Sequence, residues 1–82
     1  MNKLRDIVEL LDSNELIVIT YKSPAGVEPY YFDVVYTGYV DEMPRGVLDF
    51  NLFKSNKTEC IHIGYTLVED VEECAFYIYV TD

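Results

Sequence analysis

The feature that most constrains the fold is a period-two alternation of apolar and polar residues in the C-terminal part of the chain. Apolar or aromatic side chains alternate before and after the acidic segment 69–73, at Ile61, Ile63, Tyr65, Leu67, Cys74, Phe76, Ile78 and Val80. Successive side chains of a β-strand point to opposite faces, so this period indicates two strands. A turn at 69–72 would bring all eight to one face, pairing Leu67 with Cys74, Tyr65 with Phe76, Ile63 with Ile78 and Ile61 with Val80.

A second turn is predicted at 55–58, where Asn56 can supply the positive φ of a tight hairpin. It would join a strand at 48–54 to the strand that carries Ile63. The resulting pairs are complementary: Lys54 with Glu59, Leu52 with Ile61, Phe50 with Ile63 and Leu48 with Tyr65. Because both turns put the same residues of the shared strand inward, the sequence predicts a core centred on Ile63, between Phe50 and Ile78.

The N-terminal segment is predicted to be a helix over residues 3–12. Its apolar residues recur at the spacing of one helix face, at Leu4, Ile7, Val8 and Leu11. Asn2 can cap the start of this helix, and the segment 13–14 can end it. The connection 41–48, with Pro44 near its start, suits one short helical turn.

Two further strands are predicted at 16–22 and 30–40, on either side of a loop with two prolines and a glycine. Their register is ambiguous. We prefer the pairing of Tyr21 with Tyr30 and Ile19 with Phe32, because it leaves polar residues on the outer face. The inward side chains are then Ile17, Ile19, Phe32, Val34 and Tyr36, and the outward polar ones are Asp33 and Thr37.

Together these elements predict an α+β fold, in which one N-terminal helix packs on a single antiparallel sheet of about five strands. Residues 1–82 fit a single domain. The last strand, 74–81, has no charged residue, so it would invite pairing with another chain if it were an open edge. We expect the first hairpin to cover this strand and the protein to be a monomer, with a homodimer as the alternative.

The net charge of −9, from 15 acidic and 6 basic residues, limits the classes of partner. It disfavours direct binding of nucleic acid or of an anionic membrane, because phosphate contacts need clustered Lys and Arg. It favours a protein partner with a basic surface, a cation, or solubility alone. No apolar run approaches ~20 residues, and the start lacks the apolar region of a signal peptide, so a cytoplasmic location is expected.

The face opposite the predicted core carries His62, the only histidine, in one row with Asn51 and Tyr79, while Tyr77 lies opposite Gly64. A general base is one interpretation of His62, and an exposed surface histidine is the favoured one. Cys60 would lie ~6–7 Å away, whereas a catalytic dyad needs ~3 Å. The chain has no phosphate-binding loop, zinc-ligand pattern or nucleophile elbow, so we expect no enzyme, no cofactor and no metal site.

The two cysteines, Cys60 and Cys74, are too few for a disulfide scaffold and lack the spacing of zinc ligands. In the predicted register Cys74 points inward opposite Leu67, and Cys60 points outward opposite Thr81. They lie on opposite faces and at opposite ends of the hairpin, so two free thiols are expected.

The densest cluster of charge is acidic and comprises Glu69, Asp70, Glu72 and Glu73. Three interpretations stay open: a solvated hairpin tip, a weak cation site without the glycine of an EF-hand loop, or a contact in which carboxylates replace phosphates. The chain also has eight tyrosines. Tyr36 and Tyr65 are predicted on the inward face, and the outward ones are Tyr31, Tyr39, Tyr77 and Tyr79, which suit either a binding surface or strand formation.

The order of three segments resembles that of a group of known proteins. The segments are an opening helix at 4–12, a strand ending in Gly38-Tyr39-Val40, and the stretch Met43-Pro44-Arg45-Gly46-Val47-Leu48-Asp49 that leads into alternating strands. In this layout the chain resembles small acidic proteins encoded by phages and other bacterial mobile elements. The group includes anti-CRISPR proteins and other antagonists of bacterial defence, which are similar in size and charge. The resemblance implies no catalytic residues.

The resulting hypothesis is a small inhibitor from a phage or mobile element, which blocks a basic nucleic-acid-binding surface of a bacterial protein. Its expected contact residues are Glu69, Asp70, Glu72 and Glu73 for charge, and Tyr77, Tyr79 and His62 for contact area. The alternative is a structural or accessory protein that self-associates through its tyrosine-bearing face or an open edge strand.

Overall fold

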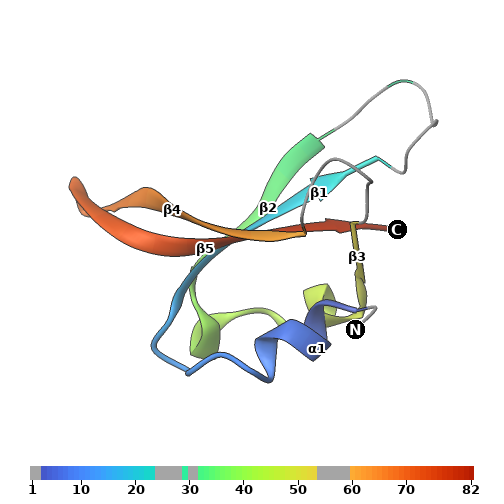
Figure 1. Cartoon of the computed structure of the whole chain (residues 1–82), viewed down its shortest axis with the longest axis horizontal. Coiled ribbons are helices and arrows are strands. Elements are labelled where there is room, and N and C mark those ends of the chain that lie inside the picture. The colour runs from blue at the N-terminus through green and yellow to red at the C-terminus, as the bar shows by residue number, and fades with distance from the viewer. Residues whose placement is uncertain (1–2, 24–28, 30–31, 54–59) are drawn as a thin grey trace.

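The chain folds into a mixed five-stranded sheet with one short helix near its N-terminus (Figure 1). The computed structural model describes residues 3–23, 29, 32–53 and 60–82. In chain order the elements are α1 (Leu4–Val8), β1 (Leu16–Lys22), β2 (Phe32–Tyr39), the 3-10 helices η1 (Val40–Glu42) and η2 (Arg45–Asp49), β3 (Asn51–Leu52), β4 (Ile61–Val68) and β5 (Val71–Thr81). The fold is therefore α+β and mostly sheet, and the strand predicted at 16–22 has the bounds of β1.

The central strand of the sheet is β5, whose two edges have different partners. On one edge, residues 76–80 pair in parallel with residues 17–21 of β1, and β2 lies beyond β1. On the other edge, β4 pairs with residues 71–78 and β3 with residues 80–81, both antiparallel. The prediction of a wholly antiparallel sheet is therefore wrong. The expectation that the first hairpin covers the uncharged last strand is confirmed for residues 76–80, where β1 pairs with it.

β3 does not pair with β4 as the sequence predicts. Leu52 lies opposite Val80 instead of Ile61. β5 continues past the residues that pair with β4, and its backbone there accepts a hydrogen bond from Phe53, whose N–H lies 2.9 Å from the Tyr79 oxygen. The predicted turn at 55–58 lies outside the described residues, as do Asn2, Tyr30, Tyr31, Lys54 and Glu59.

β4 and β5 form the predicted hairpin, but its turn is shorter than expected. Glu69 and Asp70 alone form the turn, with φ angles of 50° and 65°. Two central residues with positive φ belong to a type I′ turn, whose twist matches that of the strands. The pairing is consequently shifted by two residues, so that Ile63 lies opposite Phe76 rather than Ile78. A shift of two leaves every side chain of the strand ladder on its predicted face.

The register of β1 and β2 differs from the prediction, and their ladder contains a bulge. Ile19 lies opposite Tyr36 rather than Phe32, and the ladder then skips Val35. One extra residue turns the side chains that follow it to the other face of the sheet. Phe32 and Val34 are consequently 61% and 51% exposed instead of buried. Tyr36, on the near side of the bulge, packs against the core as predicted.

The helix is shorter than the predicted segment 3–12. After α1 the chain continues in tight turns, with the N–H of Leu10 2.9 Å from the Ile7 oxygen and that of Leu11 3.0 Å from the Val8 oxygen. These turns bring Leu11 against the core and leave Leu10 exposed. At the start of α1, the backbone N–H of Lys3 donates to the Asp6 carboxylate at 3.1 Å.

The main core lies between α1 and one face of the sheet. Its fully buried side chains are Leu4, Ile17, Ile19, Ile78 and Val80. Side chains from the η1–η2 region, among them Met43, Val47 and Phe50, pack around it. A smaller cluster on the opposite face comprises Leu16, Val18 and Ala75, against which Tyr39, Val68 and Tyr77 pack. The outward position predicted for Tyr39 and Tyr77 is thus confirmed.

Candidate functional site

The β4–β5 hairpin reaches beyond the rest of the sheet. Because β1 pairs with β5 only from Phe76 onward, residues 71–75 and their partners 64–68 form a two-stranded extension, here called the arm. Figure 1 shows the arm projecting away from α1 and from the β1–β2 hairpin. β5 anchors it, since the same strand continues into the core at Ile78.

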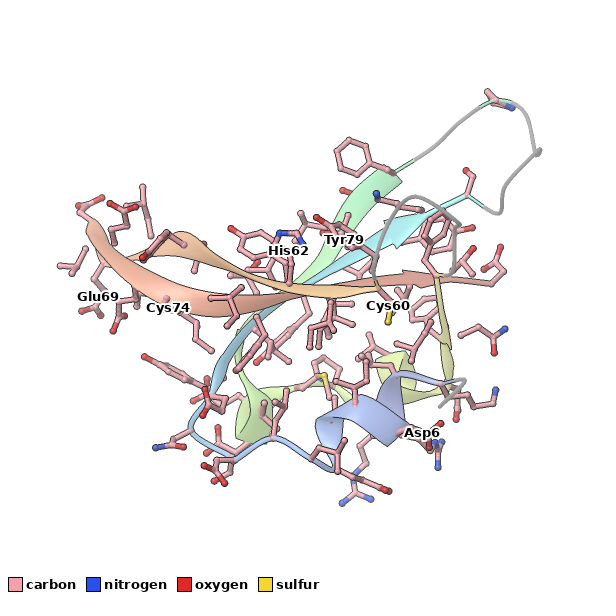
Figure 2. All side chains as sticks on the ribbon, viewed as in Figure 1. Asp6, Cys60, His62, Glu69, Cys74 and Tyr79 are labelled. Atoms are coloured by element: carbon pink, nitrogen blue, oxygen red, sulfur yellow. The ribbon has the colours of Figure 1, made fainter. Side chains whose placement is uncertain are left out.

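The end of the arm carries the four acidic residues that the sequence singles out. Glu69 and Asp70 form the turn, Glu72 and Glu73 follow at the start of β5, and all four are exposed. Figure 2 labels Glu69 at this outer end. Segment 60–82 contains neither Lys nor Arg. These four residues, here called the acidic tip, therefore form a patch of negative charge that no cation of the hairpin offsets.

One face of the hairpin is apolar and exposed, which contradicts its predicted place in the core. Ile63, Tyr65 and Leu67 are 66%, 65% and 67% exposed. They share the face of Ile61 and Phe76, which do pack against the core. A strand rises about 3.3 Å per residue and a helix only about 1.5 Å. The five-residue α1 therefore covers only part of the eleven-residue β5.

The opposite face of the hairpin carries an aromatic row, made of Tyr77, His62 and Tyr79. The rings of His62 and Tyr77 are stacked, with centroids 5.2 Å apart and planes 4° from parallel. The centroids of His62 and Tyr79 are 5.4 Å apart. The three aromatic residues among the predicted contact residues therefore meet, as Figure 2 shows for His62 and Tyr79. Asn51, predicted in the same row, instead pairs with the far end of β5, opposite Thr81.

Tyr77 crosses β4 above Gly64. The ladder places Tyr77 opposite His62 rather than Gly64, but its ring leans so that a Cβ atom at position 64 would lie 2.9 Å from Cε1. The Tyr77 hydroxyl donates a hydrogen bond of 2.6 Å to the Tyr65 carbonyl. Glycine is needed at position 64 because the ring occupies the space of a side chain there.

Tyr79 is half-buried and packs against its neighbours. The ammonium group of Lys22 lies 4.1 Å from the centre of its ring, a cation–π contact. Burial raises the pKa of the Tyr79 hydroxyl above its ordinary value of 10.0, and Tyr77 adds a smaller increase. Tyr77 and Tyr79 are half-buried and His62 is exposed. A partner that reaches the row therefore meets the His62 ring first.

The acidic tip and the aromatic row are separate parts of one hairpin. Glu73 shares the face of Tyr77 but precedes it by four residues, which is about 13 Å along a strand. Glu72 points to the other face, opposite Leu67. The predicted contact residues do not form one compact patch, so a partner that touches both parts must extend along the hairpin.

The groups with reactive side chains are dispersed in the described part of the chain. Cys60 packs against the main core rather than pointing outward as predicted, and Cys74 is exposed opposite Tyr65 rather than buried opposite Leu67. Both are free thiols. Within residues 3–23, 29, 32–53 and 60–82 there is no cluster of three metal-binding side chains and no pocket.

Sequence reasoning missed the exposed apolar face of β4, formed by Ile63, Tyr65 and Leu67. The signal that could have revealed it is length. A ten-residue helix spans about 15 Å and an eight-residue strand about 26 Å, so the predicted helix could not cover both hairpins. The charge pattern did not indicate an exposed strand, because the segment from residue 60 to residue 68 has no Asp, Glu, Lys or Arg.

None of the helices in the described ranges is long and apolar enough to cross a membrane. In comparisons with known proteins, the chain matches no protein-family model, no curated protein and no solved structure.

Proposed function

We propose that this protein is a small acidic binding module that inhibits a bacterial protein, and that a phage or mobile element encodes it. Its target would be a basic surface that normally binds nucleic acid, in the cytoplasm of the host cell. The observation that carries the proposal is the acidic tip, which holds four exposed carboxylates at the end of a projecting arm. The resemblance of the layout to anti-CRISPR-type proteins points the same way.

The acidic tip suits a basic surface in both charge and geometry. A carboxylate accepts two parallel hydrogen bonds from an Arg side chain, as a phosphate does. Glu72 and Glu73 point to opposite faces of the arm, so carboxylates are available on both sides. Long-range attraction to such a tip accelerates association, and at ~0.15 M salt it is screened over ~8 Å.

The hairpin also offers contact area that charge alone would not supply. The exposed side chains of Ile63, Tyr65 and Leu67 lie on one face, and His62 on the other. Burial of such side chains acts mostly on the dissociation rate of a complex. In this proposal the acidic tip attracts the partner, and the apolar and aromatic side chains retain it.

Self-association is the second candidate function, and the exposed face of Ile63, Tyr65 and Leu67 favours it. It would cover apolar side chains in a symmetric interface. The outward tyrosines suit this role less than expected, because Tyr77 and Tyr79 already pack against His62 within one chain. The net charge of −9 also opposes the approach of two copies.

The first experiment is capture of a partner from bacterial lysate at low salt, followed by mass spectrometry and competition with DNA or RNA. We expect a nucleic-acid-binding protein that loses its nucleic acid when this protein is added, and binding that weakens as salt rises. A captured protein that binds nucleic acid equally well with and without this chain would contradict the proposal.

A matched pair of variants assigns the effect to the acidic tip. The variant E69Q/D70N/E72Q/E73Q removes its four charges, and E9Q/D12N/D41N/E42Q removes four exposed charges elsewhere. Both variants change the net charge equally, so any effect of overall charge on association is the same in both. We expect slower association and weaker competition with nucleic acid only for the first variant. Equal losses for both variants would show that overall charge, rather than the tip, governs binding.

A further inference from the structure

The outer edge of β4 offers backbone groups for another strand. Its inner edge pairs with β5, and none of the described strands occupies the outer one. In a two-residue hairpin the pair that flanks the turn, here Val68 and Val71, is hydrogen-bonded, and bonded pairs then alternate with non-bonded ones. The even-numbered residues of β4 therefore bond to β5, and the odd-numbered residues direct their N–H and C=O groups outward.

Two hydrogen bonds agree with this assignment. The N–H of Tyr79 donates to the carbonyl of Cys60 at 2.8 Å, which continues the even-numbered series beyond the end of β4. The carbonyl of Tyr65 accepts the 2.6 Å bond from the Tyr77 hydroxyl, so this odd-numbered group is turned away from β5. A carbonyl oxygen has two lone pairs, so it can accept a second bond from an added strand.

The strand also lacks the residues that usually protect an open edge. Natural edge strands carry charged side chains or proline, which discourage pairing with another chain. β4 contains no Asp, Glu, Lys, Arg or Pro. On the face shared by Ile63, Tyr65 and Leu67, its side chains are about two-thirds exposed. An added strand would therefore gain backbone hydrogen bonds and an apolar neighbour for every second side chain.

Charge selects which strand fits this edge. The acidic tip lies directly beyond the C-terminal end of β4, at Glu69 and Asp70. A second copy of β4 would bring neither Lys nor Arg to the tip. It would also add a chain of net charge −9. A strand with basic residues at the end beside the tip would satisfy both the edge and the charge.

We infer that the outer edge of β4 binds an extended, basic segment of a partner protein by strand addition. The segment alternates apolar side chains, which contact Ile63, Tyr65 and Leu67, with polar ones, and its Lys or Arg residues lie beside the acidic tip. Main-chain hydrogen bonds supply affinity and the alternate side chains supply specificity. The inference rests on the proposed function and names the chemistry of its partner.

The test uses the whole protein and an end-capped synthetic peptide, Arg-Val-Arg-Val-Thr-Val-Thr-Val. Amide hydrogen exchange is followed by NMR at each residue of β4. Strand addition slows exchange by about tenfold or more at Ile63, Tyr65 and Leu67, whose N–H groups point outward. It leaves His62, Gly64 and Thr66 little changed, since these already bond to β5. A second peptide with citrulline in place of arginine should bind several-fold more weakly.

Two protein variants separate the edge from the tip. Ile63→Pro removes an outward N–H without removing a bond to β5, and Ile63→Thr is its control because it keeps the N–H. We expect the proline variant to lose peptide binding and the threonine variant to retain most of it. If Ile63→Pro disrupts the hairpin, the exchange rates of the unmodified protein with peptide added still test the inference, since only the odd-numbered amides of β4 should slow.

Three outcomes would overturn the inference. Charge-dependent peptide binding without slower exchange at the odd-numbered residues would show that the tip acts through side chains alone, and the proposed function would stand. Equal binding of the citrulline peptide would show that the tip does not select a basic strand. A dimer in sedimentation experiments, with the same odd-numbered amides protected before peptide is added, would show that a second copy occupies the edge.

Discussion

Burial determines how much each isoleucine of the β4–β5 hairpin contributes to stability. Ile78 is fully buried, where β1 flanks β5 and the helix-side core covers it. Ile63 is 66% exposed, although it has the same alternation and points to the same face. The difference arises from position in the sheet, because Ile78 lies on the central strand β5 under the core, whereas Ile63 lies on β4, which pairs with β5 alone.

Ile78→Ala should lower the free energy of unfolding by about 2–5 kcal/mol, since it leaves a cavity in a packed core. Ile63→Ala should lower it by less than about 1 kcal/mol, as is usual for an exposed site. Urea denaturation followed by circular dichroism measures both values. A larger loss for Ile63→Ala would mean that this face of β4 is covered in solution.

The role of Gly64 depends on one neighbouring side chain, that of Tyr77. A Cβ atom at position 64 would displace the Tyr77 ring and break its hydrogen bond to the Tyr65 carbonyl. Gly64→Ala should therefore cost about 1 kcal/mol or more. Gly46→Ala is the matched control, because its Cβ would meet no atom within 4 Å. The cost at position 64 should largely disappear in a Tyr77→Ala background, and additive losses would contradict the contact.

Among the elements, β5 is one strand in two environments. Residues 76–80 have β1 on one edge and β4 or β3 on the other, whereas residues 71–75 pair with β4 alone. An isolated two-stranded hairpin is marginally stable in water. The arm therefore depends on its continuation into the core for its stability.

Native-state hydrogen exchange should show this division along β5. The amides of residues 71–75 should exchange faster than those of residues 76–80, because opening the arm does not require the core to open. The comparison needs only the unmodified protein at low concentration. Equal protection along the whole strand would indicate that another chain or a neighbouring segment holds the arm.

For the whole molecule, the net charge of −9 becomes more negative as its tyrosines ionise at alkaline pH. Burial, followed by the charges of Glu42 and Asp41, raises the pKa of Tyr36 above 10.0. Burial likewise raises the pKa of Tyr79. Both groups thus hold their protons more tightly in the folded protein than in the unfolded chain.

These shifts predict a loss of stability at alkaline pH. Between the unfolded and folded pKa values of these tyrosines, the folded protein binds more protons, so the free energy of unfolding falls as pH rises. The stability that the protonated tyrosines contribute is fully present below pH ~10 and is lost as pH rises above it. Tyr36→Phe and Tyr79→Phe should each flatten the fall, measured by urea denaturation from neutral to alkaline pH. An unchanged slope in both variants would contradict the assignment.

Local patterning in the sequence determined several features of the fold correctly. The strand predicted at 16–22 has the bounds of β1, and the alternation in the C-terminal part placed Ile63 and Ile78 on the same face. The positions of the four acids predicted an acidic hairpin tip. These properties depend on neighbours along the chain, and an error of two residues in register does not change the face of a side chain.

Tertiary structure alone decided which edges meet and what is covered. The parallel pairing of β1 with β5, the bulge at Val35 and the pairing of β3 with β5 all join backbone groups that are distant in sequence. Alternation carries no information on which strand lies beside another, because every strand offers the same N–H and C=O groups. The exposure of Ile63, Tyr65 and Leu67, and with it the candidate interaction surface, arises because α1 is too short to extend the core along the whole of β4.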